Sequence, residues 1–245
     1  MFEKMVFQQL SAYLEDNNIL SKQQAGFRRK KLSTQTSLLG VTNNWYINMD
    51  EGFLNGLIFL DLKKAFDCVN HNILIRKLSI YGVRGLALEW FKSYLNDRKQ
   101  ICKNNQVVSE QHTIRCGVLQ GSNLGPLLFV LYINDLPHCL DDASASMFAD
   151  DTNLTTKGKT IEEVEANLNN NLEKVHQWLL SNKLTLNKDK TEYMIIGSRK
   201  RLNNFNDDPS IGLDNKNIKR VKQCKTLGIV INIVTSYYGR STLIM

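Results

Sequence analysis

Helix-like and strand-like segments follow one another in irregular order along these 245 residues, and this order restricts the fold more than any other feature. Apolar residues spaced three and four apart predict helices near residues 6–14, 38–45, 72–81, 86–95, 125–136 and 160–179. Short apolar or alternating runs predict strands near residues 57–62, 113–118, 146–149, 152–156, 193–196 and 226–231. Because helices and strands do not alternate strictly, we expect a chain of the α+β class.

Composition excludes several classes of protein. A hydrophobic fraction of 42%, with 14 glycines and 3 prolines, excludes collagen-like and proline-rich disordered chains. The longest apolar run, residues 126–133, is far shorter than the roughly 18 residues that a membrane span needs. Five scattered cysteines without a C-x-x-C pair favour neither a disulfide framework nor a zinc site. We therefore expect an intracellular protein without a membrane partner, and its net charge of +7 is compatible with a polyanionic one.

Three carboxylates stand where the surrounding pattern calls for apolar residues. Asp61 ends the apolar run 57–60, and Asp150 and Asp151 lie at the tip of the hairpin predicted at 146–156. Any one of them alone would ordinarily be a solvated turn acid. Adjacent carboxylates repel unless a cation lies between them, and ligand sets made only of oxygen favour Mg²⁺ or Mn²⁺ over zinc. On neighbouring strands, the three acids could hold two such ions for an in-line phosphoryl displacement.

Six motifs occur in a recognisable order. The segments FLDLKKAFD (59–67), GVLQGSNLGP (117–126) and FADD (148–151) follow one another in the chain. They closely resemble the first three palm motifs of reverse transcriptases, and more narrowly those of jockey-like non-LTR (LINE-type) retrotransposons. The chain also resembles the fourth palm motif, the primer-grip motif and the fingers signature, at LTLNKDKTE (184–192), LGI (227–229) and QAGFR (24–28) followed by Ser33-Thr34. The resemblance covers about residues 1–231.

This resemblance implies a right-hand polymerase with an antiparallel palm sheet packed on helices. The fingers would lie mainly in residues 1–56 and part of 82–116, and the palm mainly in 57–81 and 117–231. The remaining residues, 232–245, form an atypical tail without the helical pattern of a thumb. We therefore expect a partial gene copy in which the thumb is missing.

The resemblance also implies roles for individual residues. Asp61, Asp150 and Asp151 match the aspartates that bind two Mg²⁺ or Mn²⁺ ions. Lys190 matches a lysine that protonates or neutralises the pyrophosphate leaving group. The residues that match the primer grip are Leu227 and Gly228.

The positions that match the nucleotide-binding residues of the family are Arg28, Leu62, Phe66, Gln120 and Gly121. A guanidinium such as that of Arg28 suits bidentate contacts with a triphosphate. The flat ring of Phe66 would exclude ribonucleotides by steric rejection at the sugar 2′-position. Gln120 and Gly121 would form a turn beside the incoming nucleotide and the template base. We expect Asp67 to orient the site or to cap the helix that follows it.

The reaction implied is attack by a primer 3′-hydroxyl on the α-phosphate of a dNTP, on an RNA or DNA template, during retrotransposon replication. Two alternatives stay open. One is a decayed or domesticated fragment that binds nucleic acid without turnover, mainly through the basic residues 28–31. The other is a group II intron maturase or another template-directed polymerase. A retrotransposon product is expected in the nucleus and cytoplasm, and the sequence predicts no particular oligomeric state.

Overall fold

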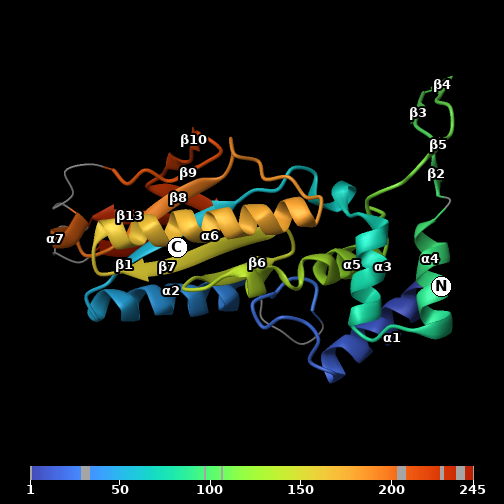
Figure 1. The fold of residues 1–245 in the computed structure, drawn as a ribbon, viewed down its shortest axis with the longest axis horizontal. Coiled ribbons are helices and arrows are strands. Elements are labelled where there is room, and N and C mark those ends of the chain that lie inside the picture. The colour runs from blue at the N-terminus through green and yellow to red at the C-terminus, as the bar shows by residue number, and fades with distance from the viewer. Residues whose placement is uncertain are drawn as a thin grey trace. The chain divides into compact units, whose positions relative to one another are not determined.

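The computed structural model describes residues 2–28, 34–96, 98–105, 107–202, 208–226, 229–235 and 241–244. The chain divides into two compact units, and Figure 1 labels most of their helices and strands. The helical unit consists of Met1–Leu20, Lys64–Asn134 and Asn182–Leu184. The sheet unit consists of Ser21–Lys63, Asp135–Ser181 and Thr185–Met245.

The sheet unit is built on a five-stranded sheet with the order β11-β8-β1-β7-β6. Its strands are β1 (Leu54–Leu60), β6 (Ser144–Phe148), β7 (Asp151–Gly158), β8 (Glu192–Ile196) and β11 (Lys219–Arg220). Strand β1 pairs antiparallel with β7 and β8, β6 pairs antiparallel with β7, and only the short edge strand β11 runs parallel to its neighbour. The predicted antiparallel sheet is therefore confirmed, with one parallel strand at its edge.

Helices cover both faces of this sheet, with α2 (Thr34–Asp50) on one face and α6 (Ile161–Ser181) on the other (Figure 1). Helix α6 begins directly after Thr160, whose hydroxyl caps it by accepting a hydrogen bond from the Glu163 amide at 3.3 Å. The helix approaches β1 closely at Gly56, where an added Cβ would lie 2.5 Å from the Val164 side chain. A glycine at this position lets the apolar stripe of α6 pack directly on the sheet backbone.

Shorter elements complete the sheet unit. They are η2 (Leu136–Cys139), α7 (Arg199–Leu202), β9 (Gly212–Leu213), β10 (Lys216–Asn217), β12 (Gln223–Thr226), β13 (Ile229–Thr235) and β14 (Ser241–Ile244). Strands β12, β13 and β14 form a separate antiparallel sheet. The strand predicted at 226–231 thus corresponds to the end of β12 and the start of β13, and β13 continues to Thr235.

The core beneath α2 is centred on Trp45. Its indole is 1% exposed and packs in a cluster with Leu57, Phe59, Met194, Ile196 and Ile231. The Trp45 ring nitrogen donates to the Thr155 hydroxyl at 3.4 Å, and the Trp45 carbonyl accepts from the Asn55 side chain at 3.1 Å. These contacts fix α2 against β1 and β7.

Replacing Trp45 with alanine should lower the free energy of unfolding by about 3–5 kcal/mol, because it removes a large buried side chain and leaves a cavity. Urea denaturation followed by circular dichroism measures the loss. The control is Ile47→Ala on the same helix, since Ile47 is 46% exposed and its truncation should cost far less. Equal losses for the two variants would contradict the packing described for α2.

The helical unit surrounds the buried helix α5 (Leu124–Ile133). Every residue of α5 except Pro126 is buried, which is why its sequence is apolar on all sides. The other elements of the unit are α1 (Phe2–Asp16), η1 (Ala65–Cys68), α3 (His71–Ile80), α4 (Gly85–Leu95), β2 (Lys99–Gln100), β3 (Lys103–Asn104), β4 (Val107–Val108) and β5 (His112–Thr113). The four predicted helices of this unit are confirmed, although α5 ends at Ile133 rather than near 136.

The strand predicted at 113–118 is wrong beyond Thr113. Only His112 and Thr113 belong to a strand, and residues 114–118 follow an irregular path. Gly117 has a φ of +92°, and its amide donates to the Val69 carbonyl at 2.8 Å. An added Cβ on Gly117 would lie 2.9 Å from the Asp67 carbonyl oxygen, so glycine permits a close approach that a continuous strand would not make. No helix among the described residues is long and apolar enough to cross a membrane.

Candidate active site

The register of the sheet brings Asp61 beside Asp151. Leu60 at the end of β1 is paired with Thr152 of β7, so the next position on each strand places Asp61 opposite Asp151. Residues directly opposite in an antiparallel pair have Cα atoms about 4.5–5.5 Å apart. Asp150 precedes Asp151 in the β6–β7 turn, in which Phe148 pairs with Asp151. Within the sheet unit, the three acids therefore stand at the ends of two neighbouring strands, with Asp150 one residue before Asp151.

The fourth palm motif holds Asp61 in place. The side-chain amide of Asn187 donates to Asp61 Oδ2 at 2.7 Å, and the Asn187 backbone amide donates to the Asp61 carbonyl at 2.7 Å. The Asp61 amide in turn donates to the Thr191 hydroxyl at 3.3 Å, and Thr191 is fully buried. Asn187 and Thr191 are therefore positioning residues that sequence reasoning missed, although both stand in the motif it singled out.

Leu62 and Lys190 belong to the two chain segments that the Asp61–Asn187 hydrogen bonds join. The Lys190 amide donates to the Asn187 carbonyl at 3.1 Å, and the Lys190 residue is exposed. Leu62 forms an isolated antiparallel bridge with Leu186, which joins the segment after β1 to the segment before the Asn187 turn. The structure thus places both residues on the backbone that supports Asp61.

The side-chain amide of Gln24 holds the turn that carries Asp150 and Asp151 through hydrogen bonds. This side chain is fully buried, and its Oε1 accepts hydrogen bonds from the Gly26 amide at 2.8 Å and the Ala149 amide at 3.1 Å. Its Nε2 donates to the Ala149 carbonyl at 3.4 Å. Ala149 has a φ of +55°, a left-handed conformation that costs free energy in a residue other than glycine and persists only where its surroundings hold it. The buried amide therefore fixes the backbone directly before Asp150.

Gly26 makes this contact possible. An added Cβ on Gly26 would lie 2.5 Å from the Ala149 nitrogen, so the two backbones touch directly. The neighbouring Ala25 amide donates to the Met147 carbonyl at 2.8 Å, and the Met147 amide donates to the Gln23 carbonyl at 2.9 Å. The QAG part of the fingers signature thus packs along β6 and supports the aspartate turn, a role that its sequence did not indicate.

Arg28 contacts its own loop. Its Nη1 donates to the Ser21 carbonyl at 2.9 Å and to the Gln24 carbonyl at 3.4 Å. These contacts brace the segment that carries Gln24. The basic residues that follow, 29–31, and the primer-grip residues Leu227 and Gly228 lie outside the residues that the structure describes.

Acidic side chains supply the charge around Cys224. Cys224 on β12 lies near two acids, Glu192 and Asp151. Burial first, and then the negative charges of these two acids, raise the pKa of the Cys224 thiol to about 11. The thiol is therefore neutral at pH 7 and compensates no negative charge. Carboxylates on neighbouring strands form the all-oxygen donor set that Mg²⁺ and Mn²⁺ prefer, so the residues present fit such ions. As they stand, no three His, Cys, Asp or Glu side chains in the described part of the chain are grouped closely enough to hold a metal.

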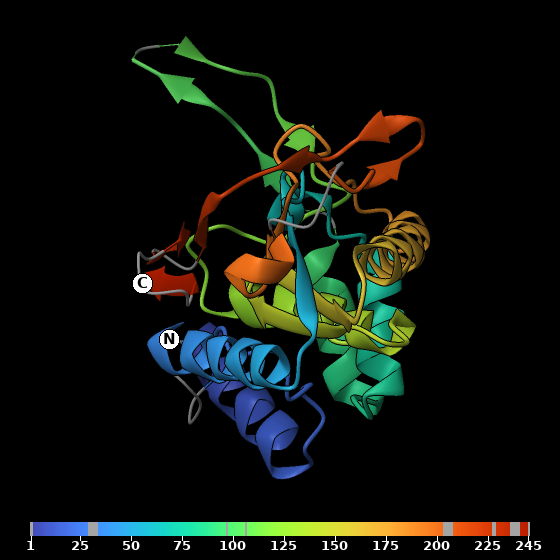
Figure 2. The ribbon, with the colours of Figure 1, turned by 90° about the vertical axis from the view of Figure 1, so that its left-hand side faces the viewer.

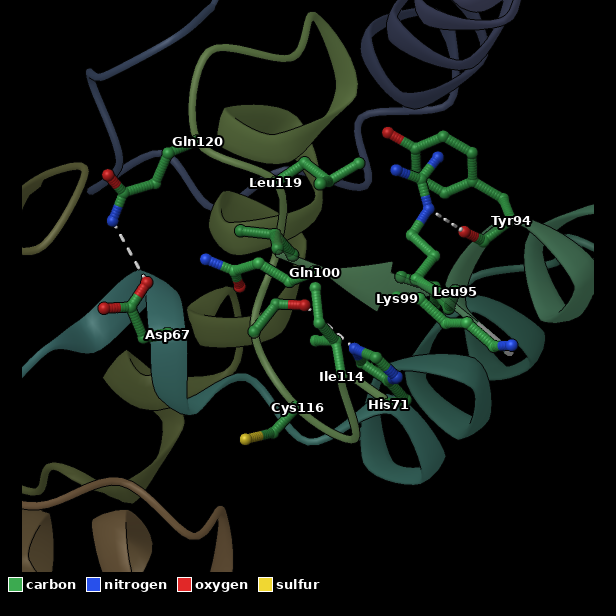
Figure 3. Close-up of a pocket in the computed structure, with 13 residues that line it drawn as sticks. Asp67, His71, Tyr94, Leu95, Lys99, Gln100, Ile114, Cys116, Leu119 and Gln120 are labelled. Carbon is green, nitrogen blue, oxygen red and sulfur yellow. Dashed lines mark hydrogen bonds between the residues drawn. The ribbon is translucent and has the colours of Figure 1, made fainter. Parts of the chain in front are cut away.

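The remaining predicted residues belong to the helical unit. The ring of Phe66 stacks on Phe129 with centroids 4.3 Å apart and an interplanar angle of 25°, and the Phe66 carbonyl accepts from the Val118 amide at 2.9 Å. Gln120 donates from its side-chain amide to Asp67 Oδ1 at 3.0 Å, as Figure 3 shows. Gly121 has a φ of +79°, which suits a turn where glycine is favoured.

Asp67 therefore connects two palm motifs. The prediction that it could cap the following helix is wrong, because α3 is capped by Asn70, whose side chain accepts from the Ile73 amide at 3.1 Å. Asp67 instead holds the side chain of Gln120, 53 residues later in the chain. The other predicted role, that of orienting the site, stays a prediction.

The sheet unit thus combines an antiparallel sheet with acids at two adjacent strand ends, and loops from two of the motifs support these strand ends. Comparison with known proteins defines the class. Residues 1–231 match the family described as reverse transcriptase (RNA-dependent DNA polymerase). The chain therefore belongs to the reverse transcriptase family, which confirms the resemblance drawn from the six motifs.

Relatives in Drosophila melanogaster support the narrower, jockey-like assignment. The chain is 30% identical over 204 residues to a probable RNA-directed DNA polymerase from transposon BS, covering 78% of this chain and 22% of that protein. It is 27% identical over 239 residues to the RNA-directed DNA polymerase from mobile element jockey, covering 95% of this chain and 25% of that protein. The chain thus spans about a quarter of the length of these relatives.

Solved structures show the same fold. Telomerase from Candida albicans, in complex with a fragment of telomeric RNA, matches with a TM-score of 0.60 at 18% identity, covering 96% of this chain and 39% of that one. Telomerase from Candida tropicalis, also in complex with such a fragment, matches with a TM-score of 0.58 at 14% identity, covering 94% and 35%. These likenesses confirm the expected fingers and palm fold.

Proposed function

We propose that this chain catalyses RNA-directed DNA synthesis, adding dNTPs to a primer 3′-hydroxyl during retrotransposon replication. One observation carries the proposal: within a member of the reverse transcriptase family, the sheet register sets Asp61 opposite Asp151. Template with primer and dNTPs are the proposed partners. A nuclear and cytoplasmic location follows from the retrotransposon relatives.

Asp61, Asp150 and Asp151 would hold two Mg²⁺ or Mn²⁺ ions, which supply charge stabilisation for the transferred phosphoryl group. Asn187 orients the Asp61 carboxylate through the contact at 2.7 Å, and Gln24 fixes the peptide before Asp150. Lys190 would neutralise or protonate the pyrophosphate that leaves. The protein thus contributes positioning and electrostatics, and none of its side chains acts as a nucleophile.

The nucleotide would be held by Arg28, Leu62, Phe66, Gln120 and Gly121. For Arg28, a role at the triphosphate would require its guanidinium to exchange carbonyl partners of its own loop for phosphate oxygens. Gln120 is held by Asp67, which keeps its amide at one position for a base or sugar contact. Leu227 and Gly228 would grip the primer.

Phe66→Ala should increase the use of ribonucleotides. Stacking on Phe129 restricts the Phe66 ring, and a restricted ring rejects a 2′-hydroxyl by collision rather than by a hydrogen bond. We expect the preference for dTTP over UTP, measured as the ratio of kcat/KM values, to fall on the order of 100-fold. Phe53→Ala in the other unit serves as the control, and an unchanged ratio in Phe66→Ala would contradict this role.

A second candidate function is binding of nucleic acid without turnover, which the basic residues 28–31 and the net charge of +7 favour. Primer extension on poly(rA)/oligo(dT) with dTTP and Mg²⁺ or Mn²⁺ separates the two functions. Extension that disappears in an Asp150→Ala, Asp151→Ala variant supports polymerisation. If the folded wild type binds primer–template but is as inactive as the variant, the chain is a binding fragment.

A further inference from the structure

Residues 98–105 and 107–115 form a two-stranded ribbon that extends away from the end of α4 in Figures 1 and 2. Strands β2 and β5 pair near its base, and β3 and β4 pair near its tip. Every described residue from 99 to 113 is exposed, including Val107 at 74% and Ile101 at 56%. A two-stranded ribbon without a covered face is marginally stable in water, so this one is suited to gaining contacts from a partner.

The ribbon carries a concentrated positive charge. Residues 98–115 hold four basic side chains and one acidic side chain, a formal charge of +3 within 18 residues, against +7 for the whole chain of 245. The basic side chains are Arg98, Lys99, Lys103 and Arg115. Within the part of the chain that the structure describes, none of Lys99, Lys103 and Arg115 forms an ion pair. Charges without intramolecular partners on an exposed ribbon favour a polyanionic partner.

A cavity of about 460 Å³ lies at the root of the ribbon (Figure 3). Arg98, Gln100 and Gln120 are among the residues that line it. The Arg98 guanidinium lies 4.5 Å from the centre of the Tyr94 ring, and its Nε donates to the Tyr94 carbonyl at 2.8 Å, so the cation is held in place. The cavity also contains one carboxylate, that of Asp67, which already accepts the Gln120 amide. Its lining thus continues from the basic ribbon to the Gln120 turn.

We propose that the ribbon and the cavity at its root bind single-stranded nucleic acid, with the phosphates along the basic side chains and the strand directed toward Gln120. Positive groups compensate backbone phosphates, and an arginine stacked on an aromatic ring presents a flat surface to an unpaired base. The inference rests on the proposed function in one respect, that the bound strand serves as the template.

A second copy of the chain fits this surface less well than nucleic acid. Addition of a strand from another copy requires a long, regular edge, but each ladder of the ribbon is only two residues long. The two ladders are separated by residues 101–102 on one strand and 109–111 on the other, an unequal spacing that interrupts the edge. Two identical ribbons would also bring like charges together.

The test measures fluorescence anisotropy of a labelled, unstructured 20-nucleotide RNA, without dNTP or divalent metal, between 50 and 300 mM KCl. We compare the wild type with Lys99→Gln, Lys103→Gln, Arg115→Gln. The affinity at 100 mM KCl should fall on the order of 10- to 100-fold, and the slope of log Kd against log salt should decrease by about 2, since three phosphate contacts are lost. The matched control, Lys4→Gln, Lys157→Gln, Lys216→Gln, removes the same charge elsewhere and should leave the slope near that of the wild type.

An unchanged affinity and slope in the ribbon variant, or no RNA binding by the wild type, would overturn the proposal. The proposal would also be overturned if sedimentation detected a dimer of the wild type that is absent in the ribbon variant. A parallel series with single-stranded DNA shows which nucleic acid the ribbon prefers. Primer extension by the same wild-type preparation separates this inference from the proposed function. If the protein binds RNA through the ribbon but does not extend the primer, only the polymerase assignment is wrong. If it extends the primer but its RNA binding does not depend on the ribbon, only the ribbon assignment is wrong.

Discussion

Asp150→Asn should reduce primer extension by about 1,000-fold or more while leaving the protein folded. The substitution keeps the shape of the side chain but removes the negative charge proposed to hold a divalent ion, and metal stabilisation of a phosphoryl transition state is worth several kcal/mol. Each 1.36 kcal/mol corresponds to a tenfold change in rate. Pre-steady-state incorporation of a single dTTP on an RNA template measures the loss in the chemical step.

Asp142→Asn is the matched control for this variant. Asp142 is an exposed acid just before β6, the first strand of the hairpin that carries Asp150 at its tip, so the change in net charge is the same. Its extension rate should stay within about twofold of the wild type. If Asp150→Asn retains a rate similar to that of Asp142→Asn, Asp150 does not bind a catalytic metal, and the assignment of the aspartate turn is wrong.

Gln24→Leu should produce the second large effect, on stability and activity together. Leucine has a similar volume but leaves the Ala149 amide, the Ala149 carbonyl and the Gly26 amide without the partner that Gln24 supplies. A buried polar group left without a partner costs about 1–3 kcal/mol, so we expect the free energy of unfolding to fall by about 2–4 kcal/mol. Thermal melting and urea denaturation measure this loss.

The activity of Gln24→Leu separates a positioning role from a purely structural one. At a temperature well below the melting transition, kcat for dTTP incorporation should fall on the order of 10- to 100-fold, because misplacement of a catalytic group by about 1 Å has effects of that size. The KM for primer–template should change little. Gln23→Ala, at the exposed neighbouring glutamine, is the control. A destabilised variant with full kcat in its folded fraction would show that Gln24 does not position Asp150.

The placement of the three aspartates at strand ends could be predicted from sequence because its signal is local. An acid that ends an apolar run and an acid pair at a hairpin tip both violate the apolar pattern around them, and each violation is visible within ten residues. The register that sets Asp61 opposite Asp151 follows from the pairing of Leu60 with Thr152, which depends on the whole β1–β7 ladder. The chain thus encodes the carboxylate pair in the placement of single residues relative to strand ends.

The groups that support the site could not be predicted in this way. Gln24 contacts Ala149 across 125 positions of the chain, and Asn187 contacts Asp61 across 126. A lone glutamine or asparagine in a loop carries no periodic signal, and its partner is defined only once the sheet has formed. Their hydrogen bonds are a property of the tertiary fold, although both residues belong to motifs that the resemblance had marked.

The ribbon was missed for a different physical reason. Its strands are two residues long and exposed on all sides, so no alternation of apolar and polar residues marks them. In the adjoining segment, the local pattern at 113–118 resembles a strand, but the left-handed backbone at Gly117 and its contact with Val69 override it. Sequence patterning reports burial, and it fails where an element buries little or where a glycine redirects the chain.

Template-directed addition of one nucleotide tests the central claim most directly. The chain, an RNA template and an annealed DNA primer are mixed with Mg²⁺ and each of the four dNTPs singly, and extension and pyrophosphate release are measured together. We predict that only the dNTP complementary to the next template base is added, with one pyrophosphate released for each addition, and that a primer ending in a dideoxynucleotide is not extended. Addition regardless of the template base, or no addition by folded protein that binds the primer–template, would contradict the account.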